Sequence, residues 1–249
     1  CVLRGYKLVC TATTKISKEK IGLLEAHGAR VIICPVDVAA DDPRSYYKVA
    51  ERIRDEEGAY LPNQYHNEAN PIVHYEKTGP EIWDQSGGTV THWVAGVGTG
   101  GTVSGVSRYL KEQNPAIRTI GVDPVGSVYA YWNEHGHLPP PEELGFYLID
   151  GIGQSYMPDS CWPETIDEVI TVSDQIAYDE VFALAKSEAI FTGSSGAAAA
   201  WAAREVARKL PGDTLVVTLL PDSGERYLSK LNPEWMKEKG LLGAEEGLS

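Results

Sequence analysis

The segment GVGTGGT, residues 96–102, decides the fold of this chain through what stands on either side of it. The apolar run 92–95 before it predicts a buried strand, and the spacing of apolar residues over 103–113 predicts a helix. A second strand is predicted at 119–122. A strand, a helix and a strand in this order form one βαβ unit, in which the two strands lie parallel. We therefore predict an α/β fold.

The same alternation of strands and helices runs along the rest of the chain. The first 60 residues predict two strand–helix units, with strands at 6–10 and 31–34 and helices at 17–27 and 43–57. Later residues predict helices at 71–85, 176–189 and 197–210, strands at 169–172 and 214–220, and a loop at 127–145. We expect residues 1–60 to form the remainder of a small N-terminal α/β domain and residues 61–249 a large one.

The composition excludes several classes of function. The chain has 249 residues and a formal net charge of -13, which argues against nucleic acid and anionic membranes as partners. It contains no apolar run long enough to span a bilayer. The four cysteines, Cys1, Cys10, Cys34 and Cys161, form no C-x-x-C pair. They suggest neither a zinc site nor a disulfide framework, so we expect a reducing, cytoplasmic location.

The glycines of residues 96–102 predict a phosphate-binding loop. Glycine adopts positive φ and lets the backbone approach a ligand closely. The amides at the start of the following helix face such a ligand, and the helix dipole favours an anion there. Thr99 and Thr102 add hydroxyl donors. The alternative is a tight strand-to-helix turn whose glycines serve only close packing.

The identity of the phosphate is a separate question. Gly96, Gly98 and Gly101 satisfy G-x-G-x-x-G, and Asp123 ends the next predicted strand. That combination is the dinucleotide-binding fingerprint and would suit an NAD-dependent dehydrogenase. Two features count against it. The βαβ unit lies in the middle of the chain. The other segments, in the order in which they follow one another along the chain, match a different family.

Eight segments carry that second match, namely KISKEK (15–20), HGA (27–29), NQYHNEANP (63–71), GVGTGGT (96–102), GVDPVGS (121–127), IDGIG (149–153), TGSSGA (192–197) and LPDSGERYLSK (220–230). Each is weak alone, but together and in this order they resemble the fold type II pyridoxal-phosphate (PLP) enzymes. The closest branch is the cysteine synthase and cystathionine β-synthase family. The resemblance implies a tryptophan-synthase-β-like fold with two three-layer αβα domains, the small one incomplete here. It also implies a homodimer.

The same resemblance implies roles for individual residues. The phosphate of pyridoxal 5'-phosphate would lie in a cradle made by Gly98, Thr99, Gly100, Gly101 and Thr102. Ser194 would hydrogen-bond the pyridine nitrogen of the cofactor. The substrate would lie near Gln64, Tyr65, Gly151, Ile152 and Gly153.

The residues themselves also allow less specific interpretations. Gly193, Ser194 and Ser195 precede an alanine-rich helix, so one of the two serines is a natural helix cap. Gln64 and Asn67 could be loop residues that cap the next helix. A neutral serine beside the pyridine nitrogen is chemically reasonable, because it does not require that nitrogen to be protonated.

The chain departs from the family in one respect. Family members carry the Schiff-base lysine in an S-x-K-D-R type motif and bind substrate with an S-G-N-T-G type loop, and neither motif occurs here. We therefore name no lysine and expect it in a segment before Cys1. The alternative is a non-catalytic scaffold that keeps the fold without the lysine.

Two substrate pairs compete within the family. Cystathionine β-synthase condenses serine with homocysteine, whereas cysteine synthase uses O-acetylserine and sulfide. Asp150, directly before 151–153, favours the first, because that branch usually has an acid there. The segment GPEIW (79–83) favours the second. We expect cystathionine β-synthase activity, with Asp150 managing the proton that the departing hydroxyl needs.

Overall fold

The computed structural model describes residues 1–241, and these divide into two units. The first consists of Cys1–Pro62 with Glu225–Gly240, and the second contains Asn63–Gly224. The predicted boundary at residue 60 lies close to Pro62, but Glu225–Gly240 joins the first unit instead of the large domain. Side chains fix it there, because Ser229 donates to Glu19 at 2.7 Å. Residues 242–249, which we assigned to the large domain, lie outside the described residues.

The first unit is built on two parallel strands. Its elements are a 3-10 helix η1 (Val2–Arg4), β1 (Val9–Thr13), α1 (Lys18–Ala26), β2 (Arg30–Cys34), α2 (Tyr46–Glu57) and α9 (Pro233–Glu238), with most of the 3-10 segment η5 (Gly224–Lys230). The pairing runs from Val9 with Arg30 to Thr13 with Cys34. This register starts the strand at Val9, three residues later than the sequence predicts.

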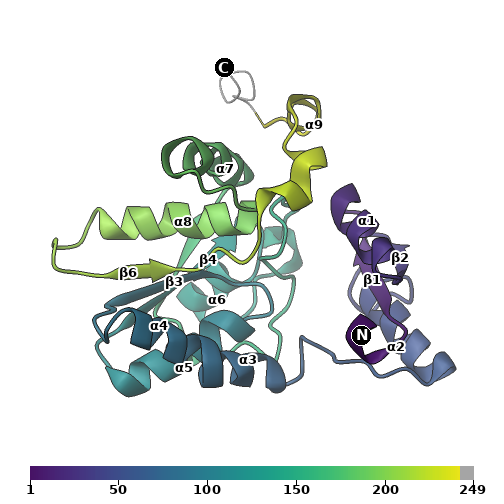
Figure 1. Cartoon of the computed structure of the whole chain (residues 1–249), viewed down its shortest axis with the longest axis horizontal. Coiled ribbons are helices and arrows are strands. Elements are labelled where there is room, and N and C mark those ends of the chain that lie inside the picture. Colours follow the sequence, from purple (N-terminus) through teal and green to yellow (C-terminus); the bar gives the residue numbers. More distant parts are fainter. Residues whose placement is uncertain (242–249) are drawn as a thin grey trace. The chain divides into compact units, whose positions relative to one another are not determined.

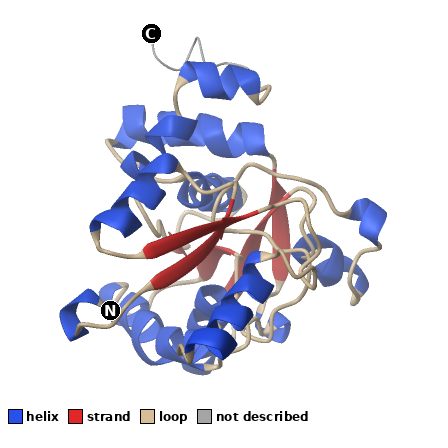
Figure 2. Ribbon diagram, turned by 90° about the vertical axis from the view of Figure 1, so that its right-hand side faces the viewer, coloured by secondary structure: helices blue, strands red, loops and turns tan. Residues whose placement is uncertain are grey.

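The second unit contains a four-stranded parallel sheet with the order β5-β4-β3-β6. Its strands are β3 (His92–Gly96), β4 (Arg118–Pro124), β5 (Glu168–Val172) and β6 (Val216–Thr218). Its helical segments are α3 (Ala69–Val73), the π-helical turn η2 (His74–Thr78), α4 (Gly79–Gln85), α5 (Gly101–Gln113), α6 (Tyr129–His135), η3 (Pro141–Glu143), η4 (Pro163–Thr165), α7 (Asp174–Glu188) and α8 (Ser194–Ala207). Figure 2 draws the strands of the molecule in red and its helices in blue. The predicted α/β fold with parallel sheets is confirmed.

Helices cover both faces of this sheet, with α7 and α8 on one side and α4, α5 and α6 on the other (Figure 1). The alternation of side chains along β3 explains the two layers. Trp93 and Ala95 belong to the hydrophobic core that includes Leu110 of α5, whereas Val94 belongs to the core that includes Ala198 and Ala202 of α8. A strand buried on both faces is what a parallel sheet requires.

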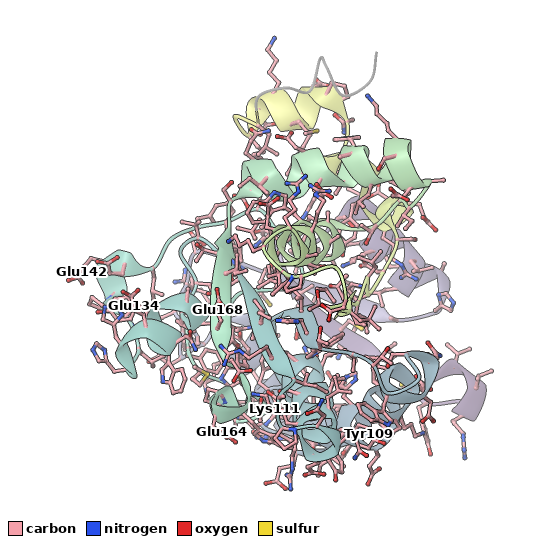
Figure 3. All side chains as sticks on the ribbon, turned by 90° about the vertical axis from the view of Figure 1, so that its left-hand side faces the viewer. Tyr109, Lys111, Glu134, Glu142, Glu164 and Glu168 are labelled. Atoms are coloured by element: carbon pink, nitrogen blue, oxygen red, sulfur yellow. The ribbon has the colours of Figure 1, made fainter. Side chains whose placement is uncertain are left out.

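Close packing and an ion pair fix α5 against its neighbours. A Cβ on Gly79 of α4 would lie 2.7 Å from the Cβ of Tyr109. Lys111 pairs with Asp167 at 2.8 Å (Tyr109 and Lys111 are labelled in Figure 3). Within residues 1–241, no helix combines the length and the apolar character needed to cross a membrane.

Helix α6 contradicts the prediction of a loop over residues 127–145. Asp123 at the end of β4 caps it, because one carboxylate oxygen accepts the amides of Tyr129 at 3.0 Å and Ala130 at 3.1 Å. Gly136, with a φ of 74°, ends it. The prolines at 139–141 suggested a loop throughout, whereas the helix depends on an acid six residues before its start.

Candidate functional site

The predicted phosphate loop lies at the point where the chain changes direction across the sheet. From β3 the chain moves to β4 and then β5, and β6 later returns to the other side of β3. Ligands of open parallel sheets bind at the carboxyl ends of the strands at such a switch point. Residues 96–102 leave β3 at that end and enter α5, so the fold places this loop where a ligand is expected.

The loop glycines are required by their protein neighbours. A Cβ on Gly98 would lie 2.5 Å from the carbonyl oxygen of Gly151, and one on Gly101 would lie 2.0 Å from Oδ1 of Asn70. Gly100 has a φ of 84°, and a Cβ there would lie 2.3 Å from the Cβ of Cys161. The close-packing interpretation is therefore correct for these three glycines. Close packing of the glycines is compatible with a second role for this turn, in which its backbone amides bind a phosphate.

Side chains from three distant segments bind the loop. The hydroxyl of Tyr129 donates to the carbonyl of Gly98 at 2.5 Å. The hydroxyl of Ser160 donates to the carbonyl of Thr99 at 2.7 Å. The side-chain amide of Asn70 donates to Oγ1 of Thr99 at 2.9 Å. The loop conformation is thus fixed by residues outside the motif itself.

The predicted substrate segment 151–153 lies directly beside this loop. The amide of Gly153 donates to the carbonyl of Val97 at 2.8 Å. A Cβ on Gly96 would lie 2.6 Å from Cγ2 of Ile152. Gly151 and Gly153 have φ values of 92° and 84°, so both use backbone conformations that favour glycine.

Ser194 also comes to this place, but it is not a helix cap. The cap of α8 is Gly193, and Ser194 is the first helical residue. The hydroxyl of Ser194 accepts the amide of Asp150 at 3.2 Å and also interacts with Tyr178. The prediction that a serine caps this helix through its side chain is therefore wrong for Ser194. Its hydroxyl instead joins α8 to the segment 149–153.

Gln64 and Tyr65 are connected to the loop through their backbone. The side-chain amide of Asn70 donates to the carbonyl of Gln64 at 2.7 Å, and the amide of Ser160 donates to the carbonyl of Tyr65 at 3.1 Å. Oδ1 of Asn67 accepts the amide of Ala69, the first residue of α3, at 3.0 Å, whereas the cap position of that helix is Glu68. All predicted site residues thus belong to the second unit.

Sequence reasoning assigned no role to several residues that contact the site. Asn70 lies inside the quoted segment 63–71, so its proximity to Gln64 gave a local signal. Tyr129 and Ser160 gave none, because they follow the residues they bind by 31 and 61 positions. His74 contacts Oγ1 of Thr102 through Nε2 at 3.1 Å, and burial lowers the pKa of His74.

Asp123 bears on the dinucleotide alternative. Its carboxylate is fully buried and caps α6, so it is not available to a ribose hydroxyl. Burial raises the pKa of Asp123 to about 7. The hydrogen bonds from Ser127 and from the two amides lower this pKa, but their effect is smaller than that of burial. The fingerprint acid therefore has a structural role inside the fold, which removes the main support for nicotinamide binding.

Comparison with known families agrees with the resemblance drawn from the motifs. A family model described as pyridoxal-phosphate dependent enzyme matches residues 1–222. The chain belongs to this family. Pyridoxal 5'-phosphate is accordingly the cofactor on which the family depends.

Curated relatives place the chain more narrowly among pyridoxal-phosphate dependent enzymes. A cystathionine beta-synthase of Apis mellifera is 36% identical over 242 residues, which cover 96% of this chain and 47% of that protein. Another, from Oryctolagus cuniculus, is 35% identical over 251 residues, covering 98% and 44%. The chain thus spans less than half the length of these relatives.

Solved structures show the same likeness. An O-acetylserine dependent cystathionine beta-synthase from Helicobacter pylori has a TM-score of 0.80 and 36% identity, covering 92% of this chain and 71% of that one. An O-ureido-L-serine synthase has a TM-score of 0.80 and 29% identity, covering 92% and 69%. The similarity therefore extends over nearly the whole of this chain.

Proposed function

We propose that the protein containing this chain catalyses a pyridoxal-phosphate dependent β-replacement, condensing serine with homocysteine to cystathionine. The observation that carries the proposal is the convergence of three segments at the carboxyl end of β3. The phosphate loop, the segment 149–153 and Ser194 meet there through the contacts of Gly98 with Gly151 and of Ser194 with Asp150. The named relatives support the same class of reaction.

The loop fits the phosphate group. Gly98, Thr99, Gly100, Gly101 and Thr102 run from the end of β3 into the first turn of α5. First-turn amides have no partner within their own helix, and the helix dipole favours negative charge there. With a net charge of -13, this chain offers no general attraction for an anion, so a local backbone cradle is the suitable device.

Ser194 fits the ring. Pyridoxal 5'-phosphate, when bound, supplies an electron sink for the α-carbon of an amino acid. The oxygen of Ser194 accepts the amide of Asp150, which leaves its one proton to be donated, either to the phenol oxygen of Tyr178 or to a ligand. Such a donor suits an unprotonated pyridine nitrogen.

The remaining predicted residues suit an amino-acid substrate. Gln64 and Tyr65 would hold its carboxylate, and Gly151, Ile152 and Gly153 would leave room beside the ring. Asp150 would manage a proton at the β-hydroxyl oxygen of serine, because hydroxide is a poor leaving group without one. The homodimer implied by the resemblance is part of the same proposal, and light scattering of the purified protein tests it.

A second candidate reaction uses O-acetylserine as the amino-acid donor. The structure from Helicobacter pylori is described as an O-acetylserine dependent cystathionine beta-synthase, at 36% identity to this chain. Acetate leaves without the proton that hydroxide needs. The two donors therefore differ in how strongly they should depend on Asp150.

Substitution of Asp150 separates these candidates. We expect Asp150→Gln to lower kcat/KM for serine about tenfold or more, while kcat/KM for O-acetylserine changes less than about threefold. Steady-state assays with homocysteine as acceptor measure both. Asp159→Gln is the control, because Asp159 is an acid at the surface that contacts His66. Full serine activity in Asp150→Gln would contradict the role of Asp150.

The other classes of function predict different results. A nicotinamide-dependent dehydrogenase would bind NAD and leave pyridoxal 5'-phosphate unbound. A non-catalytic scaffold would bind pyridoxal 5'-phosphate reversibly and turn over neither donor.

A further inference from the structure

The carbonyl groups of the phosphate loop are held by buried hydroxyls that lie outside the motif. Tyr129 and Ser160 expose only 2% and 1% of their surface, and they donate to the carbonyls of Gly98 and Thr99. Tyr129 and Cys161, the neighbour of Ser160, belong to one hydrophobic core. The two hydroxyls therefore approach the loop from the same buried region.

This arrangement fixes where the next two amides point. In a planar trans peptide the C=O and N–H groups point in opposite directions. A hydrogen bond that holds the Gly98 carbonyl toward Tyr129 therefore turns the amide of Thr99 away from Tyr129. In the same way, the hydrogen bond from Ser160 to the carbonyl of Thr99 turns the amide of Gly100 away from Ser160. In the part of the chain that the structure describes, neither amide donates to a protein acceptor.

Asn70 acts on the hydroxyl of Thr99 in a comparable way. A threonine hydroxyl has one proton to donate and two lone pairs that accept. Oγ1 of Thr99 accepts the side-chain amide of Asn70 at 2.9 Å and the amide of Gly101 at 3.4 Å. With its acceptor positions occupied by the protein, the Thr99 hydroxyl has its proton available for a ligand oxygen.

We propose that Tyr129, Ser160 and Asn70 are positioning residues that turn the donors of the phosphate loop toward the cofactor phosphate. They hold two carbonyls and one hydroxyl oxygen from behind, so that the amides of Thr99 and Gly100 and the proton of Thr99 face one anion. Successive amides that converge in this way form an anion-binding nest. The inference rests on the proposed function, since it concerns the same phosphate.

The test compares two forms of the cofactor that differ only in the phosphate. Dissociation constants for pyridoxal 5'-phosphate and for pyridoxal are measured by absorbance titration of the purified protein and of Tyr129→Phe and Ser160→Ala. Each variant is expected to bind pyridoxal 5'-phosphate about tenfold more weakly, while its affinity for pyridoxal changes less than about twofold. A general loss of folded protein moves both constants together, so the ratio isolates the effect on the phosphate.

Two matched variants serve as controls. Ser107 is fully buried; its hydroxyl donates to the carbonyl of Thr165 at 2.7 Å and also bonds Oγ1 of Thr119 at 2.6 Å, so Ser107→Ala removes buried hydroxyl bonds elsewhere on α5. The hydroxyl of Tyr75 donates to Glu112 at 2.7 Å, so Tyr75→Phe makes the same chemical change as Tyr129→Phe away from the loop. Both controls should keep the wild-type ratio of the two constants.

The outcomes distinguish the inference from the proposed function. A selective loss of pyridoxal 5'-phosphate affinity in Tyr129→Phe and Ser160→Ala, absent from the controls, supports the inference. If the two variants lose affinity equally for both ligands, or lose none, the inference is overturned. The proposed function still stands in that case, provided that the wild type prefers the phosphorylated form. A wild-type protein without that preference contradicts the phosphate cradle itself and therefore the proposed function.

Discussion

Helices α7 and α8 are neighbours of similar length in one layer, yet they begin differently. The hydroxyl of Ser173 caps α7 by accepting the amide of Ile176 at 3.3 Å. The cap position of α8 is Gly193 and that of α5 is Gly100, and a glycine has no side chain that could accept a first-turn amide. Among the described α-helices, α5 and α8 are the ones with glycine at the N-terminal cap position, and both enter the candidate site.

The difference shows how one structural element serves stability in one place and binding in another. A serine or asparagine cap satisfies a first-turn amide within the protein and stabilises the helix. Side chains cap α1, α2, α7 and α9 in this way, through Ser17, Ser45, Ser173 and Asn232. A glycine cap gives up that stabilisation and leaves first-turn amides for a ligand. Three predictions test this contrast.

The largest effect is expected for Gly100→Ala. The new Cβ would meet Cys161 at 2.3 Å, and the φ of 84° disfavours any side chain. Strain and overlap together should lower the free energy of unfolding by about 2–5 kcal/mol, and the distorted loop should lose about 100-fold in pyridoxal 5'-phosphate affinity.

Gly136→Ala is the control for Gly100→Ala. Gly136 also has a positive φ, of 74°, but among the described residues no atom lies within 4 Å of the position that a Cβ would take there. It should lose about 1–2 kcal/mol of stability and keep the wild-type affinity for the cofactor. Equal affinities for Gly100→Ala and Gly136→Ala would refute the role of the loop geometry.

A smaller effect is expected from Asp123, the acid that caps α6. Burial raises its pKa to about 7 in the folded state, from 3.8 for an exposed aspartate. The folded protein therefore binds this proton more tightly than the unfolded chain, so the contribution of Asp123 to stability falls as the pH rises from about 4 to about 7.

Asp123→Asn should remove that pH dependence. The asparagine oxygen can still accept the amides of Tyr129 and Ala130, but it does not titrate. Between pH 4 and 7 the free energy of unfolding of the wild type should fall by about 2–4 kcal/mol relative to the variant. Urea denaturation of both proteins at several pH values measures the difference, and parallel curves would count against a raised pKa.

The smallest effects compare the two serines at the starts of α7 and α8. Ser173→Ala should lower stability by about 1 kcal/mol and leave cofactor binding and kcat unchanged. Ser194→Ala should lower kcat about tenfold, because the ring loses a hydrogen-bond donor. Thermal unfolding measures the stability of both variants, and steady-state assays measure their kcat. If Ser173→Ala impaired turnover as much as Ser194→Ala, the contrast between the two helix starts would fail.

The sequence predicted the parts of the molecule that depend on local patterns. The βαβ unit around residues 96–102 is correct because apolar periodicity and glycine spacing are properties of neighbouring residues. Helix α6 was missed because its cap, Asp123, lies outside the helix and the prolines after it suggested a loop. The bonds of Tyr129 and Ser160 to the phosphate loop could not be foreseen, since only the tertiary fold brings these hydroxyls to Gly98 and Thr99.

The same reasoning applies to Ser194. Its position before an alanine-rich run predicted a helix cap, which is the commonest local role of serine there. The structure instead pairs its hydroxyl with the amide of Asp150, 44 residues earlier. Only the family resemblance, and not the local pattern, pointed to a role for this serine in binding.

Binding of the phosphate by residues 96–102 is tested most directly by a ³¹P NMR spectrum of the purified protein with one equivalent of pyridoxal 5'-phosphate. A phosphate held there should give a single bound resonance whose chemical shift stays constant as the pH is varied around 6, the usual pKa of a phosphate monoester. A cradle of amides and a helix start would hold the dianion through that range. A resonance that titrates like the free cofactor would show that residues 96–102 do not bind the phosphate and would contradict the central claim.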